Sequence, residues 1–270
     1  MVGRHGPDRA SGAACYRGGM DTAVRSELAP GPAVGDESLE ARPIAVRWLG
    51  RIDYRQAWAL QRELVEARIA GTIPDQLLLL EHPAVLTLGR NADERFVRAP
   101  IAELERRGIE LIRVERGGEV TYHGPGQLVA YPILALSRRG LLVRPLVRAL
   151  EAALAETCRA LGVEAGPRAG HPGCWVEPEG PAPRKIGALG LRVERGVCFH
   201  GIALNVDPAL ADFGLLDPCG LPGVISTSIA AELGRPAEPP SIAAVARAGS
   251  IFARAFARGL GTELVGSLPA

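Results

Sequence analysis

Two residues of this chain stand out for the chemistry that they could do together, Lys185 and Cys219. Lys185 is the single lysine among 31 basic residues, and all the others are arginine. A lysine amine can give up its proton once its pKa is lowered, whereas a guanidinium stays charged. A thiol becomes a strong nucleophile when a nearby ammonium lowers its pKa. We therefore predict that Lys185 lies beside Cys219, either as an ion pair or as a neutral amine that accepts the thiol proton.

Both residues also have plainer interpretations. Lys185 could be a surface lysine that escaped the bias toward arginine, and Cys219 could be a small buried residue, the commoner role of a cysteine. Cys219 lies in the segment DPCGLPG, where prolines and glycines can hold a thiol out of regular structure and leave nearby amides free to donate. Cys174, Cys198, His200 and Cys219 could be combined as metal ligands, but no pair among them has the usual zinc spacing.

A second region with chemical potential is RGGEVTYHGPGQL, residues 116–128. Gly117 and Gly118 allow a backbone to approach a ligand closely, although they could equally form a plain bend. His123 could act as a base, as a donor that orients a substrate, or as a hydrogen-bonded structural residue. The segment lacks the Gly-x-x-x-x-Gly-Lys pattern of a phosphate loop, so this pattern gives no support for nucleotide binding.

The composition argues against several classes of protein. A net charge of +1 gives no electrostatic basis for binding nucleic acid or an anionic membrane. The chain is 47% hydrophobic, which allows a sizeable core, but no charge-free stretch has the character of a membrane-spanning helix. Five cysteines without a Cys-x-x-Cys pair, and no secretory signal, indicate free thiols in a reduced, cytoplasmic protein.

The hydrophobic pattern predicts the elements that must position these residues. Asp53 is expected to cap a helix over residues 54–70 that Gly71 ends. Further helices are expected at 101–107, 144–161 and 228–233, and in a last helix with Ile242, Val245, Phe252 and Phe256 directed inward. Strands are expected at 44–49, 76–81, 85–88, 109–114 and 173–176, on both sides of the turn at 123–126, and in a hairpin of 184–193 with 197–206.

This order of elements predicts an α+β fold with a mixed β-sheet packed against helices. We expect one domain over residues 43–262 and a C-terminal tail at 263–270. Residues 1–42 are rich in Gly, Ala, Pro and Arg, and we interpret them as a disordered N-terminal extension. Met1 and Met20 are both possible starts of the chain.

Three motifs together carry a resemblance to a known family. RGGEVTYHGPGQLVAYPIL, RKIGALGLRVERGVCFHGIALNV and DPCGLPG occur in this order. In order and spacing they resemble the octanoyltransferases of lipoate biosynthesis, over nearly all of residues 43–262. The resemblance implies an α/β fold similar to the catalytic domains of biotin and lipoate protein ligases.

The resemblance also implies an activity, which is transfer of an octanoyl group from acyl carrier protein to a lysine of a lipoyl domain. Acceptors would be the lipoyl domains of 2-oxoacid dehydrogenases and the glycine cleavage H protein, with no cofactor and no metal. Cys219 would become the acyl-thioester and Lys185 would lower its pKa. The acyl-binding residues implied are Arg116, Gly117, Gly118, Glu119, Val120, Thr121, Tyr122, His123, Ala188, Leu189, Gly190, Gly201, Ile202 and Ala203.

Three other functions remain open from the sequence. An ATP-dependent lipoate or biotin protein ligase would use its lysine to bind an acyl-adenylate, but it has no need of a thiol nucleophile. An amidotransferase that moves octanoyl between lipoyl domains would use a cysteine and a different donor. A non-catalytic acyl-binding module would need neither Lys185 nor Cys219.

Overall fold

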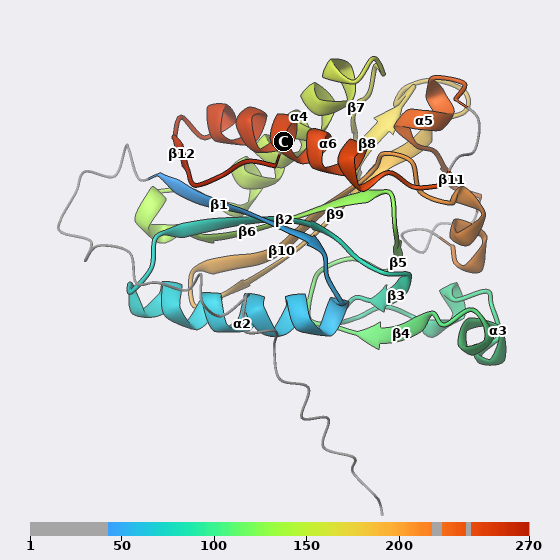
Figure 1. Cartoon of the computed structure of the whole chain (residues 1–270), viewed down its shortest axis with the longest axis horizontal. Coiled ribbons are helices and arrows are strands. Elements are labelled where there is room, and N and C mark those ends of the chain that lie inside the picture. Colours follow the sequence, from blue (N-terminus) through green and yellow to red (C-terminus); the bar gives the residue numbers. More distant parts are fainter. Residues whose placement is uncertain (1–42, 218–222, 236–238, 270) are drawn as a thin grey trace, which may run out of the picture. The chain divides into compact units, whose positions relative to one another are not determined.

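The computed structural model describes residues 43–217, 223–235 and 239–269 of the chain. The predicted N-terminal extension and Cys219 lie outside the described residues. Within them, nine strands form one sheet and three strands form a second, smaller sheet. Helices cover both faces of the large sheet (Figure 1). The predicted α+β class, with a mixed sheet packed against helices, is confirmed.

The large sheet has the strand order β12-β1-β2-β6-β10-β9-β8-β7, and β11 pairs with β9. The strand pairs β1–β2, β1–β12 and β9–β11 are parallel, and the other neighbours are antiparallel. β12 lies past residue 262, so the sheet extends beyond the predicted end of the domain. The strand bounds are β1 Ile44–Arg51, β2 Asp75–Glu81, β6 Gln127–Ala135, β7 Gly166–Arg168, β8 His171–Val176, β9 Arg184–Glu194, β10 Val197–Asn205, β11 Ile225–Ser226 and β12 Leu264–Val265.

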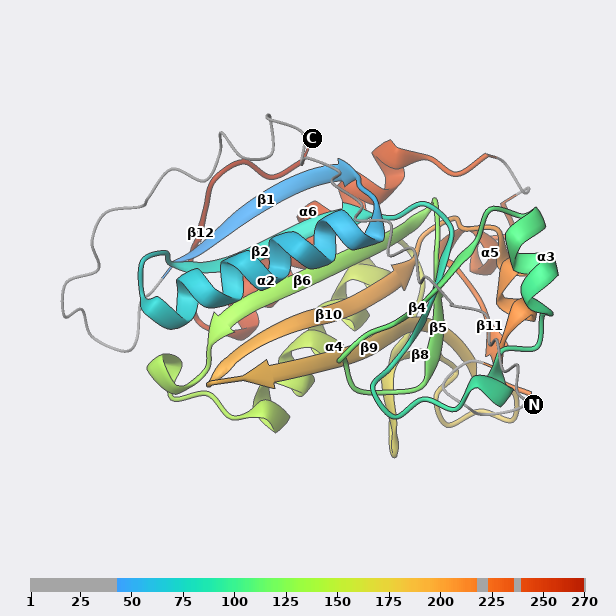
Figure 2. The same cartoon turned by 90° about the horizontal axis from the view of Figure 1, so that it is seen from below.

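The small sheet consists of β3 (Val85–Leu88), β4 (Glu110–Arg113) and β5 (Val120–His123). β3 is the middle strand, parallel to β4 and antiparallel to β5. The turn at 124–126 carries the chain from β5 in the small sheet to β6 in the large sheet. The two strands around this turn were predicted, but the change of sheet between them was not. Figure 2 shows the small sheet beside the end of the large one.

The helices begin and end close to the predicted residues. They are α2 Tyr54–Ala70, α3 Ile101–Arg106, α4 Val143–Ala160, α5 Ile229–Glu232 and α6 Ile242–Gly259, with short 3-10 helices η1 Glu94–Phe96, η2 Ser137–Arg139 and η3 Leu210–Leu215. The side chain of Asp53 accepts hydrogen bonds from two backbone amides of the first turn of α2, and Gly71 ends this helix in the left-handed conformation. Among the described residues, no helix combines the length and the apolar character needed to cross a membrane.

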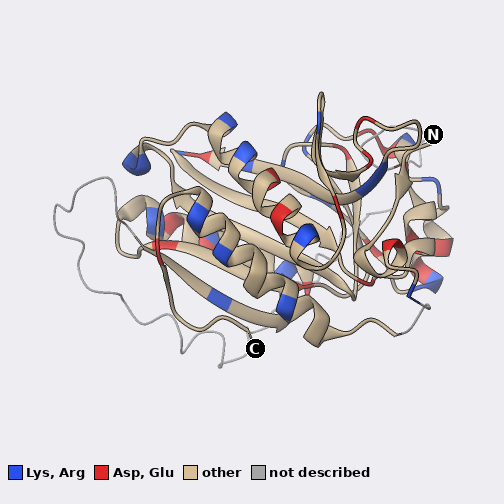
Figure 3. Ribbon diagram, turned by 90° about the horizontal axis from the view of Figure 1, so that it is seen from above, with Lys and Arg blue, Asp and Glu red and all other residues tan. Residues whose placement is uncertain are grey.

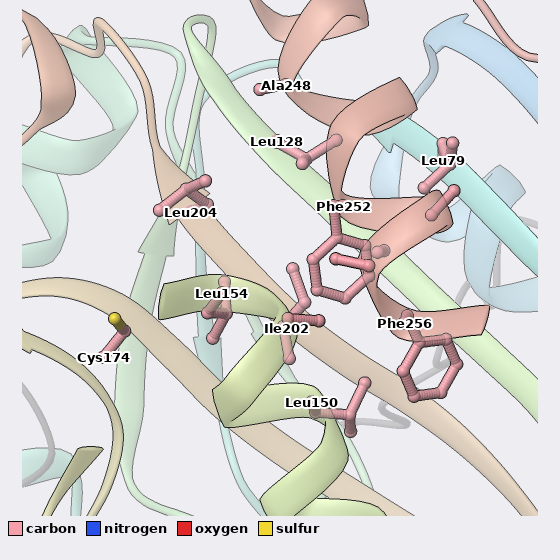
Figure 4. Packing of buried hydrophobic residues seen from close by; sticks show 14 of the residues in the cluster. Leu79, Leu128, Leu150, Leu154, Cys174, Ile202, Leu204, Ala248, Phe252 and Phe256 are labelled. Carbon is pink, nitrogen blue, oxygen red and sulfur yellow. The ribbon is translucent and has the colours of Figure 1, made fainter. Parts of the chain in front are cut away.

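The main hydrophobic core lies between the large sheet and helices α4 and α6 (Figure 4). Phe252 and Phe256 of α6 are fully buried there, together with Leu150 and Leu154 of α4. The prediction that Ile242 points inward was wrong, because 44% of its surface is exposed. Ile242 is the first residue of α6, one turn before Val245, where the helix becomes buried.

The opposite face of the large sheet is covered by α2, which packs on β6 and β10. This helix buries polar side chains as well as apolar ones. Arg68 is 2% exposed and its Nε lies 2.5 Å from Oδ1 of the buried Asp75. Asp75 also pairs with Arg139 and accepts a hydrogen bond from the amide of Ala135. The acid is thus fully paired, as a buried charge must be to avoid a large desolvation cost.

Candidate active site

A central cavity lies between the start of α2, the segment that leads into β5, and strands β9 and β10. Its interior volume is about 50 Å³, and the cavity opens to solvent. The predicted acyl-binding residues that line it are Arg116, Gly118, Glu119, Val120, Thr121, His123, Ala188, Leu189, Gly190, Gly201, Ile202 and Ala203. Three motifs that are distant in the sequence therefore meet around one hollow.

Two of the predicted acyl-binding residues do not line this cavity. Tyr122 is 1% exposed and packs in the small core beside the second sheet, where its hydroxyl donates to Oδ2 of Asp212 at 2.8 Å. Successive residues of β5 point to opposite sides, so Tyr122 is directed away while Thr121 and His123 reach the cavity. Gly117 lines a neighbouring hollow instead, because its amide is bound to the carbonyl of Leu191.

Three further residues line the cavity that the sequence did not suggest: Tyr54, Tyr131 and His200. Tyr54 opens α2 and could have been considered, because it directly follows the predicted cap. Tyr131 and His200 lie within buried strands, and nothing in the pattern indicates which side of the sheet they face. Burial raises the pKa of Tyr54 to about 12, so its phenol is neutral.

Arg116 shapes the wall of the cavity. Its guanidinium donates to the backbone carbonyls of Gly117 and Glu119, and to both the carbonyl and the hydroxyl of Thr87 in β3. The segment is packed so closely that a Cβ on Gly89 would lie 1.8 Å from the carbonyl oxygen of Gly118. Arg116 thus holds the glycine-rich segment against β3, and its Nη atoms are occupied by protein acceptors.

His123 is one end of a buried hydrogen-bond chain. Its Nδ1 lies 2.7 Å from Oε1 of Gln127, whose amide nitrogen donates to Oδ1 of Asn205. Asn205 in turn donates to the carbonyl of Thr227. This direction of bonds leaves Nδ1 of His123 as the donor and Nε2 as an acceptor. Burial and the nearby His82 lower the pKa of His123 to about 3, so at neutral pH its ring is uncharged.

A second buried histidine supports the same wall. His82 lies with Nδ1 at 2.7 Å from the carbonyl of Ile52 and with Nε2 at 2.9 Å from the hydroxyl of Tyr131. The carbonyl can only accept, so Nδ1 donates and Nε2 accepts from the tyrosine. Burial lowers the pKa of His82 to about 4. This neutral ring holds Tyr131 in place at the cavity wall.

Lys185 lies on β9, three residues before Ala188, which lines the cavity. It is 6% exposed. Its Nζ donates to the carbonyl of Pro172 at 3.1 Å and lies 4.9 Å from the centre of the Trp175 ring. A cation over an indole face is an attractive arrangement. A Cβ on Gly173 would meet Cε of Lys185 at 3.3 Å and the carbonyl oxygen of Gly187 at 2.4 Å, so glycine at 173 leaves room for this side chain.

Cys219 falls in residues 218–222, outside the described part, but the chain on both sides of it is held. The amide of Asp217 donates to the carbonyl of Phe96 at 2.8 Å. After the segment, β11 pairs Ser226 with Lys185, and the amide of Thr227 donates to the carbonyl of Lys185 at 2.9 Å. The predicted contact between Lys185 and Cys219 stays a prediction.

The described cysteines are Cys158, Cys174 and Cys198, all buried and free. Sγ of Cys198 lies 3.4 Å from the carbonyl of Pro132, and Cys174 packs in the main core. In the described ranges, no three His, Cys, Asp or Glu side chains gather as a metal site would require.

Comparison with known proteins gives a consistent family. Residues 53–249 match the model of the lipoyl protein ligase A/B catalytic domain. An octanoyltransferase of Mycolicibacterium gilvum is 50% identical over 72% of this chain and 78% of its own length. An octanoyltransferase of Chloroflexus aurantiacus is 45% identical over 78% of this chain and 95% of its own length.

Solved structures agree with this family at the level of the fold. A putative lipoate protein ligase from T. acidophilum superposes with a TM-score of 0.59 and 16% identity, over 83% of this chain and 88% of that protein. A lipoate-protein ligase A bound with ATP gives the same TM-score at 15% identity, over 84% and 88% of the two chains. The expected likeness to lipoate ligase catalytic domains is confirmed, and the chain belongs to the lipoyl protein ligase A/B catalytic domain family.

Proposed function

We propose that this chain is an octanoyltransferase of protein lipoylation, which moves an octanoyl group from acyl carrier protein to a lysine of a lipoyl domain through a thioester on Cys219. The observation that carries the proposal is the cavity itself. It is bounded by residues 188–190 of β9 and residues 201–203 of β10. Strand β9 also carries Lys185, the single lysine of the chain. The curated relatives named above are octanoyltransferases.

The cavity suits an alkyl chain. Ala188 and Ala203, which pair across β9 and β10, give small apolar walls, and Gly190 and Gly201 add no side chains that would fill it. Burial of a methylene is favourable by about 0.8 kcal/mol, so six methylenes would contribute on the order of 5 kcal/mol to binding. Binding energy of this size would hold the acyl chain while the carrier protein departs.

The proposed reaction has two acyl transfers. In the first, the Cys219 thiolate attacks the carbonyl carbon of the carrier thioester, the carbon–sulfur bond to the carrier breaks, and the carrier thiolate leaves with the proton of the Lys185 ammonium, which becomes a neutral amine. In the second, the neutral amine of the acceptor lysine attacks the same carbon, the bond to Sγ of Cys219 breaks, and an amide forms. Amide formation from a thioester is downhill, so no ATP is required.

Lys185 supports the first transfer. The contacts of its Nζ with the carbonyl of Pro172 and the ring of Trp175 are contacts that an ammonium makes, and an ammonium beside Cys219 would lower the pKa of the thiol. In the second transfer, a neutral Lys185 amine could accept the proton that the attacking amine loses.

His123 would act as a hydrogen-bond acceptor toward the substrate. A ring whose pKa is about 3 is too weak a base to take protons at neutral pH. Its Nδ1 is bound to Gln127, so Nε2 presents a lone pair toward the cavity side. Of the roles that the sequence left open, base, orienting donor and hydrogen-bonded structural residue, the contact with Gln127 also supports the structural one.

An arginine-bearing groove beside Lys185 suits an acidic carrier protein. It lies between α4 and the segment that leads into β8, and its lining includes Pro172 and three arginines, Arg144, Arg148 and Arg168, against two glutamates, Glu151 and Glu179. Arg144 and Arg148 are exposed, and Pro172 is the residue whose carbonyl binds Lys185. Figure 3 shows arginines along the helices that cover this side of the sheet. Acceptors would be lipoyl domains of 2-oxoacid dehydrogenases and the glycine cleavage H protein, in the cytoplasm.

The test is a transfer assay with three donors offered to an unmodified lipoyl domain. Octanoyl-acyl carrier protein without ATP is expected to give the octanoyl-lysine amide. Octanoate with ATP, the ligase reaction, and an octanoylated second lipoyl domain, the amidotransferase reaction, are expected to give none. Product only with octanoate and ATP would contradict the proposal and favour the ligase. Product only from the second lipoyl domain would favour the amidotransferase.

A further inference from the structure

His200 lies at one end of the central cavity. Along β9, Lys185 is followed by Ala188 and then by Gly190, and the last two line the cavity. The cavity therefore has one end near Lys185, at Ala188, and one end remote from it, at Gly190. In the β9–β10 register, Ala188 faces Ala203 and Gly190 faces Gly201. His200 comes next to Gly201, so it lies at the end remote from Lys185. An acyl chain attached near Lys185 would point its last carbons toward His200.

The side chain of His200 departs from the alternation of β10. Cys198, Ile202 and Leu204 belong to the core beneath α4 and α6, and regular alternation would place His200 with them. Instead its ring lies 6.2 Å from that of Tyr131, and its Nε2 lies 3.8 Å from Oε2 of Glu115. His200 therefore faces the cavity.

The backbone conformation of His200 explains why its side chain faces the cavity. His200 has a φ of +55°, a conformation that non-glycine residues rarely adopt. Cys198 pairs with Leu134 and Ile202 with Ala130, so the residue opposite His200 is Pro132, which has no amide to donate to the carbonyl of His200. The amide of His200 donates to the buried Oε1 of Gln61 in α2, at 2.8 Å, so this residue is held from α2 and not by a regular ladder. A strained residue of this kind persists only where its surroundings fix it, and such residues gather at functional sites.

The ring then lies on the cavity side of β10, where regular alternation would not place the side chain of residue 200. Gly190 and Gly201 have no side chains at this level, and beyond the wall formed by Glu115, Arg116 and Gly118 lies a second hollow. The ring is 1% exposed, and its polar neighbour is Glu115, whose Oε2 lies 3.8 Å from Nε2, beyond hydrogen-bond distance. With no close hydrogen bond to a protein group among the described residues, the bulk of the ring is what closes this end of the cavity.

We propose that the His200 ring forms the blind end of the acyl slot and sets the longest acyl chain that the enzyme accepts; this inference rests on the proposed octanoyl transfer. The positive φ is the device that brings the ring to this end. A shorter side chain at 200 would let the chain extend toward Glu115 and the second hollow.

The experiment compares octanoyl, decanoyl, dodecanoyl and hexadecanoyl carrier thioesters with wild type, His200→Asn and His200→Gly. Asparagine and glycine both tolerate a positive φ, so the backbone can be kept while the ring is removed. The ratio of dodecanoyl to octanoyl thioester formed is expected to rise about tenfold with asparagine and further with glycine, the scale of one or two methylenes in an apolar pocket. Circular dichroism confirms that each variant is folded.

The matched control is Arg195→Gly. Arg195 also has a positive φ, at +46°, and it lies in the turn of the same hairpin, where it is paired with Glu66 on the surface. This control removes a strained side chain outside the cavity, and its chain-length profile is expected to equal that of wild type.

A second arm of the experiment measures binding and does not require the Cys219 thiol to react. In a Cys219→Ser background, binding of octanoate and dodecanoate is measured by calorimetry, with and without His200→Gly. Stronger dodecanoate binding after the substitution supports the inference even if no carrier thioester reacts, an outcome that would count against the proposed function alone. Unchanged length profiles in folded variants, in either arm, would overturn the role of His200.

Discussion

The two faces of the large sheet are built from different kinds of side chain. Beneath α4 and α6, the buried residues are almost all aliphatic or phenylalanine (Figure 4). On the face toward α2 and the small sheet, histidines, tyrosines, Arg116 and Gln127 are buried around a cavity. Apolar packing stabilises a fold without needing precise partners, whereas each buried polar group requires a hydrogen bond. The first face thus holds the sheet together, and the second gives it a site.

The largest effect is expected at the cavity face, from Lys185→Arg. Arginine keeps the charge but has no compact ammonium and no proton to exchange. Formation of the acyl-enzyme should fall by on the order of 10²–10⁴-fold, measured by rapid quench and mass spectrometry. Arg254→Lys, at an exposed position of α6, is the control and should keep wild-type rates. Equal rates in both variants would remove Lys185 from the mechanism.

Substitutions on the core face, beneath α4 and α6, are expected to lower the stability of the fold without changing the rate of acyl transfer. Phe252→Ala removes a fully buried ring and should lower the free energy of unfolding by about 3–5 kcal/mol, as measured by urea denaturation. Ile242→Ala in the same helix removes an exposed side chain and should stay within about 0.5 kcal/mol of wild type. Loss of activity in the folded Phe252 variant would show that the two faces are coupled.

The cavity face should make stability depend on pH. His82 and His123 have pKa values of about 4 and about 3 in the folded protein, against 6.5 for a free histidine. Below pH 6.5 the unfolded chain binds protons that the folded chain does not, so the free energy of unfolding falls as pH falls. From pH 7 to 5 each histidine should cost about 2 kcal/mol.

The check is denaturation at both pH values with wild type and His82→Gln. The variant has one fewer group that charges in the unfolded chain, so its loss on acidification should be smaller by about 2 kcal/mol. A wild-type curve that is flat between pH 7 and 5 would mean that these histidines are not held neutral.

The smallest effect is expected from the hydrogen bond between Tyr131 and His82 at the cavity wall. Tyr131→Phe removes the hydroxyl that donates to Nε2 of His82 at 2.9 Å and should reduce stability by about 1 kcal/mol, measured by thermal or urea unfolding. The double variant with His82→Gln should lose less than the sum of the two single losses, because the two side chains share one bond. Additive losses would argue that the bond is absent.

The elements of the fold could be predicted well because their signals are local. Asp53 and Gly71 mark both ends of α2, and the hairpin of β9 and β10 follows from two apolar runs around Gly196. The cavity motifs were identified through resemblance, not through geometry. Tyr122 does not line the cavity, and this could not be predicted because the motif does not say which side of β5 each residue faces. His200 was considered only as a metal ligand, because its orientation depends on Pro132 and Gln61, residues of other elements, and no local pattern in β10 carries that information.

The most direct test of the proposed chemistry is intact-protein mass spectrometry after mixing the chain with octanoyl-acyl carrier protein in the absence of ATP. We expect a mass gain of one octanoyl group that maps to the peptide containing Cys219, is removed by hydroxylamine, and is absent in Cys219→Ala. If the donor stays intact and no adduct forms, the cysteine mechanism is contradicted and an ATP-dependent ligase becomes the better description of this site.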